Sequence, residues 1–308
     1  MRIVSYNVRY FAHGLKGLAS TAGAKSRISD AIASLVEPPD LICLQEVEAR
    51  SLRSGIAHRG GGEVESQLDA FMRHLRASQR TQGQRVPYQA WYFPAHTYRL
   101  GKLKFYTTGL AMLVNSDRIG VIADNRDAPH HVTHYGEGTV RVAKQSRIVA
   151  HLHLEDSQGK KFHLYNTHLS LPSPFTREFW QQKIRMGYGQ NQLAEAKMLS
   201  EYLKFRSKNE PFLIGGDFNS TPGSPVYRHL TQEGGLTGAQ EALKLIDPNN
   251  PKGFSTAGFL RLRMHLDHLF GHRIQWLDLE GTCAFGDRRS RFQGLSDHVP
   301  LIGRFEPA

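Results

Sequence analysis

The chain has 308 residues, of which 40% are hydrophobic and 22% charged, a composition typical of soluble globular proteins rather than of disordered, collagen-like or disulfide-rich chains. Its 39 Lys and Arg residues exceed its 28 Asp and Glu residues, and the net charge of +11 favours a polyanionic partner. No run of about 18 apolar residues occurs, so no membrane-spanning helix is predicted.

The first residues predict a strand, because residues 2–8 alternate between apolar and polar side chains. This pattern leaves no space for a secretion signal, although a chain trimmed of a leader would show the same pattern. Only two cysteines occur, Cys43 and Cys283, and Cys43 lies in an apolar run that favours a buried, reduced thiol over a disulfide. We therefore expect a cytoplasmic protein.

Short apolar or alternating stretches predict strands along the whole chain. They cover residues 2–8, 41–45, 88–93, 110–115, 146–154, 161–168, 211–215, 265–270 and 301–305. The stretch 146–154 alternates well, with Leu152 on one face and His151 and His153 on the other. This is the pattern of a half-buried antiparallel strand.

Apolar residues at helical spacing predict helices over residues 25–36, 66–80 and 191–206. A further short helix is expected to begin at Ser224, with Ser224 as its N-cap and Pro225 at its first position. Strands and helices interleave without a linker, which favours one α/β domain over residues 1–308. The weakest order is expected around residues 51–65, 128–138 and 170–189.

Much of the excess positive charge lies in one insertion-like segment, residues 50–104, which contains ten basic residues and three acidic ones. Such a segment could form a basic wall that binds phosphates. The alternative is that Arg73, Arg76 and Arg80, which recur at helical spacing, only solvate the helix predicted over 66–80. Aromatic residues near Trp91 and Phe105 could stack on bases, but aromatic residues in strands are more often part of the core.

Polar side chains follow the ends of several predicted strands. They lie in Ser5-Tyr6-Asn7, Leu44-Gln45-Glu46, Asn166-Thr167-His168, Gly216-Asp217-Phe218-Asn219, Leu266-Asp267-His268 and Ser296-Asp297-His298. Because strand ends can direct polar groups into one cleft, we expect these groups to meet at one site. The alternative is a set of independent turns. Asp217 and Asn219 could form an Asx-turn, and His265 and His268 are interpreted as structural residues or residues at the rim of the site.

The residue types indicate the chemistry of this site. Carboxylate and amide oxygens without clustered cysteines suit Mg²⁺ or Mn²⁺. Histidines beside such a site can protonate a leaving oxygen or stabilise negative charge on phosphate. Together these groups predict metal-assisted hydrolysis of a phosphate ester.

In this order, the motifs resemble those of the endonuclease/exonuclease/phosphatase superfamily. That superfamily includes pancreatic deoxyribonuclease, apurinic/apyrimidinic endonucleases, poly(A) deadenylases, neutral sphingomyelinases and inositol polyphosphate 5-phosphatases. The resemblance extends from residue 2 to about residue 305. It implies a four-layer α/β/β/α sandwich of two mixed sheets, with the site where the sheets meet.

The resemblance also implies a role for each polar side chain at the site. Glu46 is the principal metal ligand, with Asn7 close to metal and phosphate and Asp297 contributing to the metal site. Asp217 orients and deprotonates the attacking water, and Asn219 holds that water or a phosphate oxygen.

Two histidines and an arginine complete the implied set. His298 binds the scissile phosphate and is oriented by Asp267. His168 occupies the position that assists the leaving group in deoxyribonucleases, and the acidic partner of that histidine is not identified in this sequence. Arg147 resembles an arginine that contacts phosphate.

The function expected from these residues is that of a Mg²⁺-dependent phosphodiesterase, with Mn²⁺ able to substitute, acting on DNA or RNA as a nuclease. The alternative is a phospholipid or sphingolipid phosphodiesterase or phosphatase at an anionic membrane surface. A binding module that has lost catalysis is disfavoured, because the implied catalytic residues are all present. No obligate protein partner is inferred.

Overall fold

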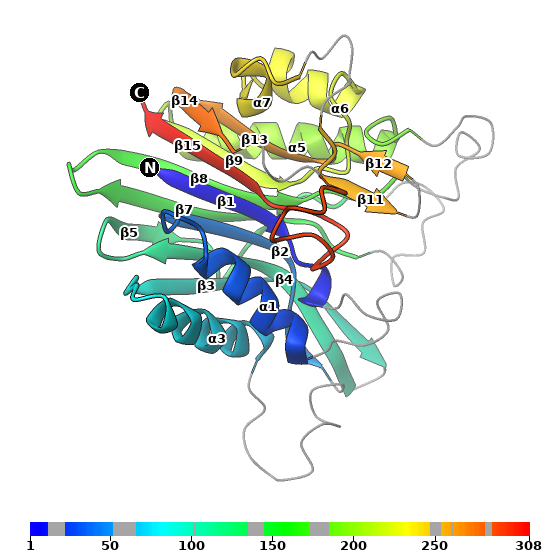
Figure 1. Cartoon of the computed structure of the whole chain (residues 1–308). Coiled ribbons are helices and arrows are strands. Elements are labelled where there is room, and N and C mark those ends of the chain that lie inside the picture. Colours follow the sequence, from blue (N-terminus) through cyan, green and yellow to red (C-terminus); the bar gives the residue numbers. More distant parts are fainter. Residues whose placement is uncertain are drawn as a thin grey trace.

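Two β-sheets packed face to face form the centre of the protein, and helices cover the outer face of each sheet (Figure 1). This is the four-layer α/β/β/α sandwich that the sequence resemblance implied. The computed structural model describes residues 1–11, 22–51, 66–100, 103–134, 145–172, 185–246, 254–259, 262–280 and 285–308. Cys283 and much of the sequence expected to be weakly ordered, residues 52–65, 135–138 and 173–184, lie outside these ranges.

The first sheet has six strands and is mixed. Their order is β14 (Ile274–Leu279), β15 (Leu301–Pro307), β1 (Arg2–Asn7), β2 (Leu41–Ser51), β4 (Leu103–Asn115) and β3 (Tyr88–Leu100). Strands β1 and β2 are parallel, and the other neighbours are antiparallel. The carboxyl ends of β1 and β2 therefore meet at one edge of the sheet.

The second sheet is also mixed. Its order is β10 (Thr237–Gly238), β13 (Asp267–His272), β9 (Phe212–Asp217), β8 (Lys161–His168), β7 (Ile148–Asp156) and β5 (Ile119–Asp124), with β6 (His130–His131) paired to β7. Strands β8 and β9 run parallel, in a register that places His168 beside Asp217. Strand β13 runs antiparallel to β9 and begins with Asp267 opposite Asp217. Two short strands, β11 (Ala257–Phe259) and β12 (Leu262–Met264), form a separate hairpin.

Apolar side chains from both sheets fill the space between them. Ile3 and Cys43 from the first sheet pack with Leu152, Leu164 and Leu213 from the second, and all five are fully buried. Cys43 carries a buried thiol without a disulfide, as expected, and burial raises the pKa of that thiol. Burial of this apolar area is the main force that holds the sheets together.

Helices α1 (Ala22–Ala33) and α3 (Gln67–Thr81) cover the outer face of the first sheet. Helix α5 (Gln190–Ser207) covers the second sheet with α6 (Pro225–Arg228) and the π-helical turn η3 (His229–Glu233), while α7 (Ala239–Ala242) contacts β13 and β14. The side chain of Ser224 caps α6 by accepting the N–H of Tyr227 at 3.3 Å, which confirms the prediction. No helix in the described ranges is long and apolar enough to cross a membrane.

The first predicted helix ends earlier than expected. Helix α1 stops at Ala33, three residues before the predicted end at Val36, and Val36 is 90% exposed. The two prolines at positions 38 and 39 follow closely, and proline disfavours helical conformation in the residue before it. Val36 is therefore an exposed residue after the helix and not part of its buried face.

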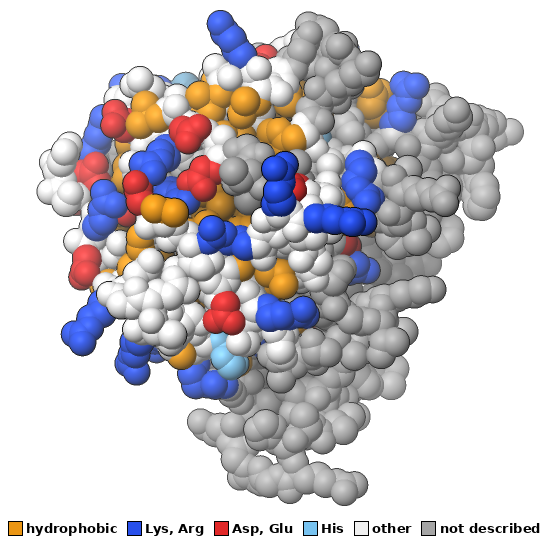
Figure 2. Space-filling view, viewed as in Figure 1, with side chains coloured by type: hydrophobic (Ala, Val, Ile, Leu, Met, Phe, Trp, Pro, Cys, Tyr) orange, Lys and Arg blue, Asp and Glu red, His pale blue; other side chains and the backbone are white. Residues whose placement is uncertain are grey.

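The basic segment is described only in part. Arg73, Arg76 and Arg80 lie exposed on α3, as the helix-solvating alternative predicted. On the face shown in Figure 2, Lys and Arg side chains are spread among Asp and Glu side chains. The side chains of Arg50, Arg53, Arg59, Arg99, Lys102 and Lys104 lie outside the described part of the chain. Trp91 and Phe93 are buried, as the core interpretation of the aromatic residues predicted.

Candidate active site

The strand ends of both sheets bring their polar side chains to one edge of the sandwich. Asn7 ends β1, His168 ends β8 and Asp217 ends β9, while Asp267 begins β13. Glu46 lies within β2 at an irregularity between Leu44 and Val47, where its φ of 55° departs from strand geometry. A β-bulge of this kind redirects a side chain, and here it turns Glu46 toward Asn7.

Asp217 lies at the centre of this group and is almost fully buried. Its Oδ2 accepts a hydrogen bond from Asn7 Nδ2 at 3.0 Å and lies 3.5 Å from His168 Nε2 and 3.6 Å from His298 Nε2. Its Oδ1 accepts the backbone N–H of Asn219 at 2.9 Å, so the Asx-turn considered from the sequence is present as well. One carboxylate oxygen shapes the turn, and the other faces the cluster.

Asp267 and His298 form a buried pair. Nδ1 of His298 lies 2.9 Å from Oδ2 of Asp267, which leaves Nε2 of His298 directed toward Asp217. Thr256 Oγ1 accepts the backbone N–H of Asp267 at 3.1 Å and fixes the start of β13. A carboxylate at Nδ1 holds the imidazole ring in one orientation.

The charges at the site alter one another's protonation. Burial alone would lower the pKa of His298, but the Asp267 and Asp217 carboxylates outweigh it and raise that pKa to about 10. Burial raises the pKa of Asp217 to about 7, against the opposing effect of His298, and it also raises the pKa of Glu46. Burial lowers the pKa of His168 well below its ordinary value, with Arg147 and His298 adding to the effect. His298 is therefore cationic at neutral pH, whereas His168 is neutral.

The other predicted site residues also lie at or beside this cluster. Asn219 Nδ2 lies 3.3 Å from His168 Nε2 and donates to the Leu169 carbonyl at 2.9 Å. Arg147, Glu46 and His168 line the same pocket. Arg147 Nε donates to Ser170 Oγ at 3.4 Å, which holds the guanidinium at the pocket wall.

Two of the three predicted metal ligands use their oxygens for other contacts. Asn7 Oδ1 accepts the backbone N–H of Arg9 at 3.0 Å, and Asp297 Oδ2 pairs with the Arg9 guanidinium at 2.7 Å. The amide nitrogen of Asn7 faces Glu46 Oε1 at 3.4 Å. In this arrangement Asn7 donates to the carboxylates of Glu46 and Asp217, and its oxygen is not directed at a metal position between them.

The residues present fit a divalent cation. Glu46 and Asp217 direct carboxylate oxygens at the same Asn7 nitrogen, and Asp267 keeps one buried oxygen, Oδ1, that has no partner among the residues described. A carboxylate oxygen of Asp217 and one of Asp267 also lie within 4.8 Å of each other. Crowded, buried carboxylates gain stability from nearby positive charge, and carboxylate oxygens are the ligands that Mg²⁺ takes.

A polar network between the two sheets, next to the site, was not predicted from the sequence. Gln45 Nε2 donates to Asn166 Oδ1 at 2.8 Å and to Ser5 Oγ at 3.2 Å, and all three residues are buried between the sheets. Asn166 Nδ2 donates in turn to the Leu44 and Ala111 carbonyls. Ser5, Gln45 and Asn166 all lie in the strand-end motifs of the sequence. Their polar side chains were expected at the active site, whereas they connect the two sheets beneath it.

Two further supports were also missed. Ser296 Oγ donates to the Asn7 carbonyl at 2.8 Å and so ties the loop that carries His298 to the end of β1. Glu195, buried on α5, accepts hydrogen bonds from the Ser170 N–H and hydroxyl at 2.8 and 2.7 Å. A fully buried glutamate in a helix is the signal that could have identified this contact.

His265 and His268 have the structural role expected of them. His265 Nδ1 lies 2.7 Å from the Phe254 carbonyl, and His268 Nε2 lies 2.7 Å from the Ser220 carbonyl. Gly216 is also structural, because a Cβ there would lie 2.2 Å from the Thr167 carbonyl oxygen. This close approach of β8 and β9 requires glycine.

Comparison with known proteins identifies relatives at the level of family and fold. The model of the Endonuclease/Exonuclease/phosphatase family matches residues 4–298, while no curated protein matches the chain in sequence. The human Nocturnin catalytic domain is similar in structure, with a TM-score of 0.64, 19% identity and coverage of 100% of this chain and 93% of that chain.

Two other similar structures carry different names. A mannosyl-6-phosphatase from Bacteroides thetaiotaomicron has a TM-score of 0.61 and 18% identity, covering 99% of each chain. A humanized D. rerio TDP2 has a TM-score of 0.58 and 14% identity, covering 99% of this chain and 98% of that chain. At these identities the structures establish the fold and no particular substrate. Because the family model spans nearly the whole chain, this protein belongs to the Endonuclease/Exonuclease/phosphatase family of metal-dependent phosphoesterases.

Proposed function

We propose that the protein is a Mg²⁺-dependent phosphodiesterase that hydrolyses DNA or RNA, with Mn²⁺ able to substitute. The observation that carries this proposal is the set of contacts around Asp217, which places a buried carboxylate 3.6 Å from His298, itself paired with Asp267. A carboxylate that can accept a proton from water therefore lies beside a positively charged imidazole that can bind phosphate. A base that activates water and a positive charge that stabilises the phosphate each accelerate hydrolysis of a phosphate ester.

Asp217 accepts the proton of the attacking water in the proposed mechanism. Its raised pKa, about 7, matches a base that works near neutral pH. Asn7 and the backbone N–H of Asn219 fix the carboxylate, and the Asn219 side chain holds the water or a phosphate oxygen. The lone pair of Asp217 thereby points into the cluster and not toward the sheet.

His298 stabilises the negative charge that grows on the phosphate. Asp267 keeps the imidazole cationic and oriented, so that Nε2–H can donate to a phosphate oxygen. The neutral His168 lies next to Asp217 on the side proposed for the leaving oxygen, and Arg147 contacts phosphate from the pocket wall. Arg9 and Asp297 form the adjoining edge of the site.

Glu46 would hold the divalent cation, with Asp297 and Asn7 beside it. When bound, the cation supplies positive charge that polarises the phosphate and stabilises the leaving oxygen. Glu46 suits this role because its carboxylate is directed into the cluster by the bulge in β2 and because burial makes its charge costly without a cation.

The net charge of +11 supports nucleic acid as the substrate, because a polymer of phosphates can use many separated basic groups at once. Arg9 and Arg147 at the site could contact phosphates next to the scissile one. An anionic membrane surface would also attract a basic protein, so lipid hydrolysis is the competing outcome.

A substrate panel tests this proposal. Hydrolysis of DNA and RNA oligonucleotides, sugar and inositol phosphates, and phospholipid vesicles is measured with Mg²⁺ or Mn²⁺, beside an Asp217→Ala control. We expect an oligonucleotide to give the highest kcat/KM. Preferential hydrolysis of vesicles or of a phosphorylated sugar would contradict the assignment to nucleic acid while leaving the phosphoesterase mechanism intact.

A further inference from the structure

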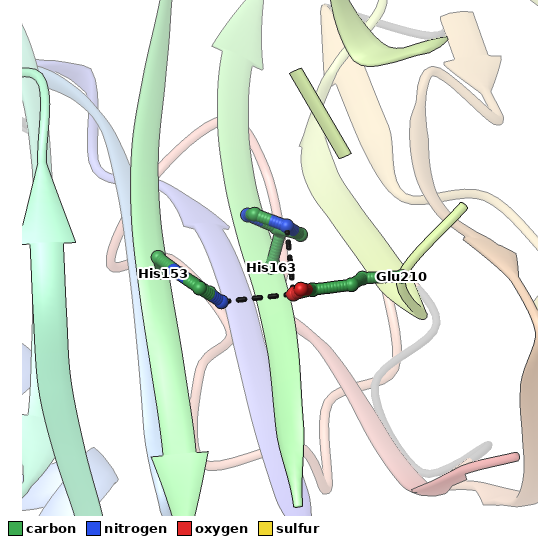
Figure 3. A group of neighbouring side chains, drawn as sticks. All are labelled: His153, His163 and Glu210. Atoms are coloured by element: carbon green, nitrogen blue, oxygen red, sulfur yellow. Dashed lines mark hydrogen bonds and ion pairs between the residues drawn. The ribbon is translucent and has the colours of Figure 1, made fainter. Parts of the chain in front are cut away.

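A second group of metal-ligand side chains lies away from the candidate active site. His153 on β7 and His163 on β8 point toward Glu210, which lies just before β9 (Figure 3). Glu210 Oε2 is 2.8 Å from His153 Nε2 and 3.2 Å from His163 Nε2. His163 is five residues before His168 on the same strand, a separation of about 16 Å at the usual rise of a β-strand.

The backbone holds the two histidines side by side. His153 and His163 are direct partners in the antiparallel register of β7 and β8, and their rings stack with centroids 4.4 Å apart. Their side chains lie on the face of the sheet opposite to the apolar core residues Leu152 and Leu164. Two imidazoles thus point in the same direction from a rigid pair of strands.

The third group is also fixed by the backbone. Lys208 and Asn209 adopt positive φ angles of 47° and 71°, and the Glu210 N–H then donates to the Ser207 carbonyl at 2.8 Å. The His163 N–H donates to the Pro211 carbonyl at 2.9 Å, next to Glu210 in the chain. This turn brings the carboxylate within reach of Nε2 of both rings.

His151 supports the arrangement from within the sheet. Its Nε2 lies 2.8 Å from His163 Nδ1, and both rings are buried. His163 can offer the lone pair of Nε2 to a metal when its proton is on Nδ1, and His151 Nε2 is placed to accept that proton in a hydrogen bond. Metal-binding histidines commonly have such a partner on the second nitrogen.

The chemistry of the donors favours zinc over magnesium. Two imidazole nitrogens and one carboxylate form one of the ligand sets of zinc, whereas Mg²⁺ prefers oxygen ligands alone. Around zinc, tetrahedral ligands bonded at about 2.0–2.1 Å lie about 3.3 Å from one another. The separations of 2.8 and 3.2 Å at Glu210 need to open by only a few tenths of an ångström.

A path to solvent is present as well. The Glu210 side chain is 41% exposed and that of His153 is 21% exposed, so a cation could enter from outside and keep one position for water. Arg206 is the basic side chain whose charge acts on His151 and His163, but it is exposed, and solvent screens it.

We propose that His153, His163 and Glu210 form a binding site for Zn²⁺ or a similar transition-metal ion, separate from the phosphoesterase site. The bound ion joins β7, β8 and the segment that leads into β9. It therefore stabilises the end of the second sheet that lies opposite the candidate active site.

Zn²⁺ binding to the full chain tests this proposal. Calorimetric titration with Zn²⁺ is carried out in excess Mg²⁺, which competes for an oxygen-ligand site, and Co²⁺ is used in parallel as a visible-absorption probe of tetrahedral coordination. We expect His153→Gln and Glu210→Gln each to weaken Zn²⁺ binding by at least about 100-fold, the upper end of the cost of losing only a supporting contact. The matched control His131→Gln, an exposed histidine on the neighbouring β6, should bind as the wild type does.

Thermal unfolding with and without chelator supplies the second measurement. Zn²⁺ should raise the Tm of the wild type and of His131→Gln, and should leave the Tm of the two site variants nearly unchanged. Wild-type protein that binds no Zn²⁺ in excess Mg²⁺, or site variants that bind it as the wild type does, would overturn the proposal. Because none of these variants touches the Asp217 cluster, such a result would not bear on the phosphoesterase assignment.

Discussion

Replacing Asp267 by Asn should reduce catalysis in a way that depends on pH. The Asp267 carboxylate lies 2.9 Å from His298 Nδ1, which places the charge centres about 4 Å apart, and both groups are buried. At the effective dielectric constant of a protein, this attraction amounts to about 4 kcal/mol, equivalent to a roughly thousand-fold change in proton affinity. Asp267→Asn should therefore lower the pKa of His298 from about 10 to about 7.

The expected loss of activity follows from that change. At pH 8 only about a tenth of His298 would remain cationic in the variant, and weaker orientation of the ring adds roughly another tenfold, so kcat/KM should fall about 10²-fold. At pH 6 the ring stays charged and the loss should be about tenfold. Profiles of kcat/KM against pH for wild type, Asp267→Asn and the control Asp278→Asn, an exposed carboxylate on β14, test this expectation.

A double-mutant cycle examines the same coupling. If Asp267 acts through His298, the combination of Asp267→Asn with His298→Ala should cost little more than His298→Ala alone. A pH-independent loss in Asp267→Asn together with multiplicative effects in the double mutant would refute the pairing as the basis of catalysis.

Four further outcomes are expected. Chelator should abolish hydrolysis, and Glu46→Gln should lower turnover with partial rescue at high Mg²⁺, as followed by initial rates; full activity in excess chelator would contradict the metal role. Asn166→Ala should lower the free energy of unfolding by about 2 kcal/mol or more, because it leaves buried partners of the inter-sheet network unsatisfied, while the exposed-strand control Gln89→Ala should stay near wild type in denaturant melts. Burial lowers the pKa of His151 to about 3 and that of His265 to about 4, so the stability that these two neutral rings contribute is present above about pH 6.5 and is lost as the pH falls toward 4; in chelator, the free energy of unfolding of the wild type should therefore decrease more steeply over that range than that of His265→Gln, and equal slopes would contradict the burial of His265 as a neutral ring. Neutralising Arg50, Arg53, Arg59, Lys102 and Lys104 together should reduce the salt dependence of oligonucleotide KM by at least about two in logarithmic slope with little change in kcat, and an unchanged slope would exclude a role for these residues in binding.

Much of the fold could be predicted because most strands are buried. Strands β1 and β9 are completely buried. Alternating apolar and polar side chains indicated β1, and the apolar residues at the start of β9 indicated that strand. Strand β14 was missed because Trp276 and Leu279 are its only buried residues, with a bulge between them that breaks the alternation. Strand β5 was missed for a similar reason, since it is an edge strand with one buried residue, Ile119.

The sequence predicted which residues form the candidate site better than it predicted how they are arranged. Asp217, Asp267 and His298 are polar side chains next to apolar stretches of the sequence, so the sequence alone indicates them. The bulge that turns Glu46 into the cluster and the engagement of Asn7 and Asp297 by Arg9 depend on tertiary contacts that no local pattern encodes. The same holds for the site at His153, His163 and Glu210, since its third ligand comes from a turn far along the chain.

The most direct test of the account compares wild type with Asp217→Asn, a substitution that keeps the size of the side chain and removes its basic oxygen. Both proteins are assayed with Mg²⁺ on the best substrate of the panel, and folding is checked by thermal unfolding. We predict that Asp217→Asn lowers kcat by at least about 10²-fold without loss of the folded state. Wild-type turnover in a folded Asp217→Asn protein would contradict the assignment of this cluster as the active site.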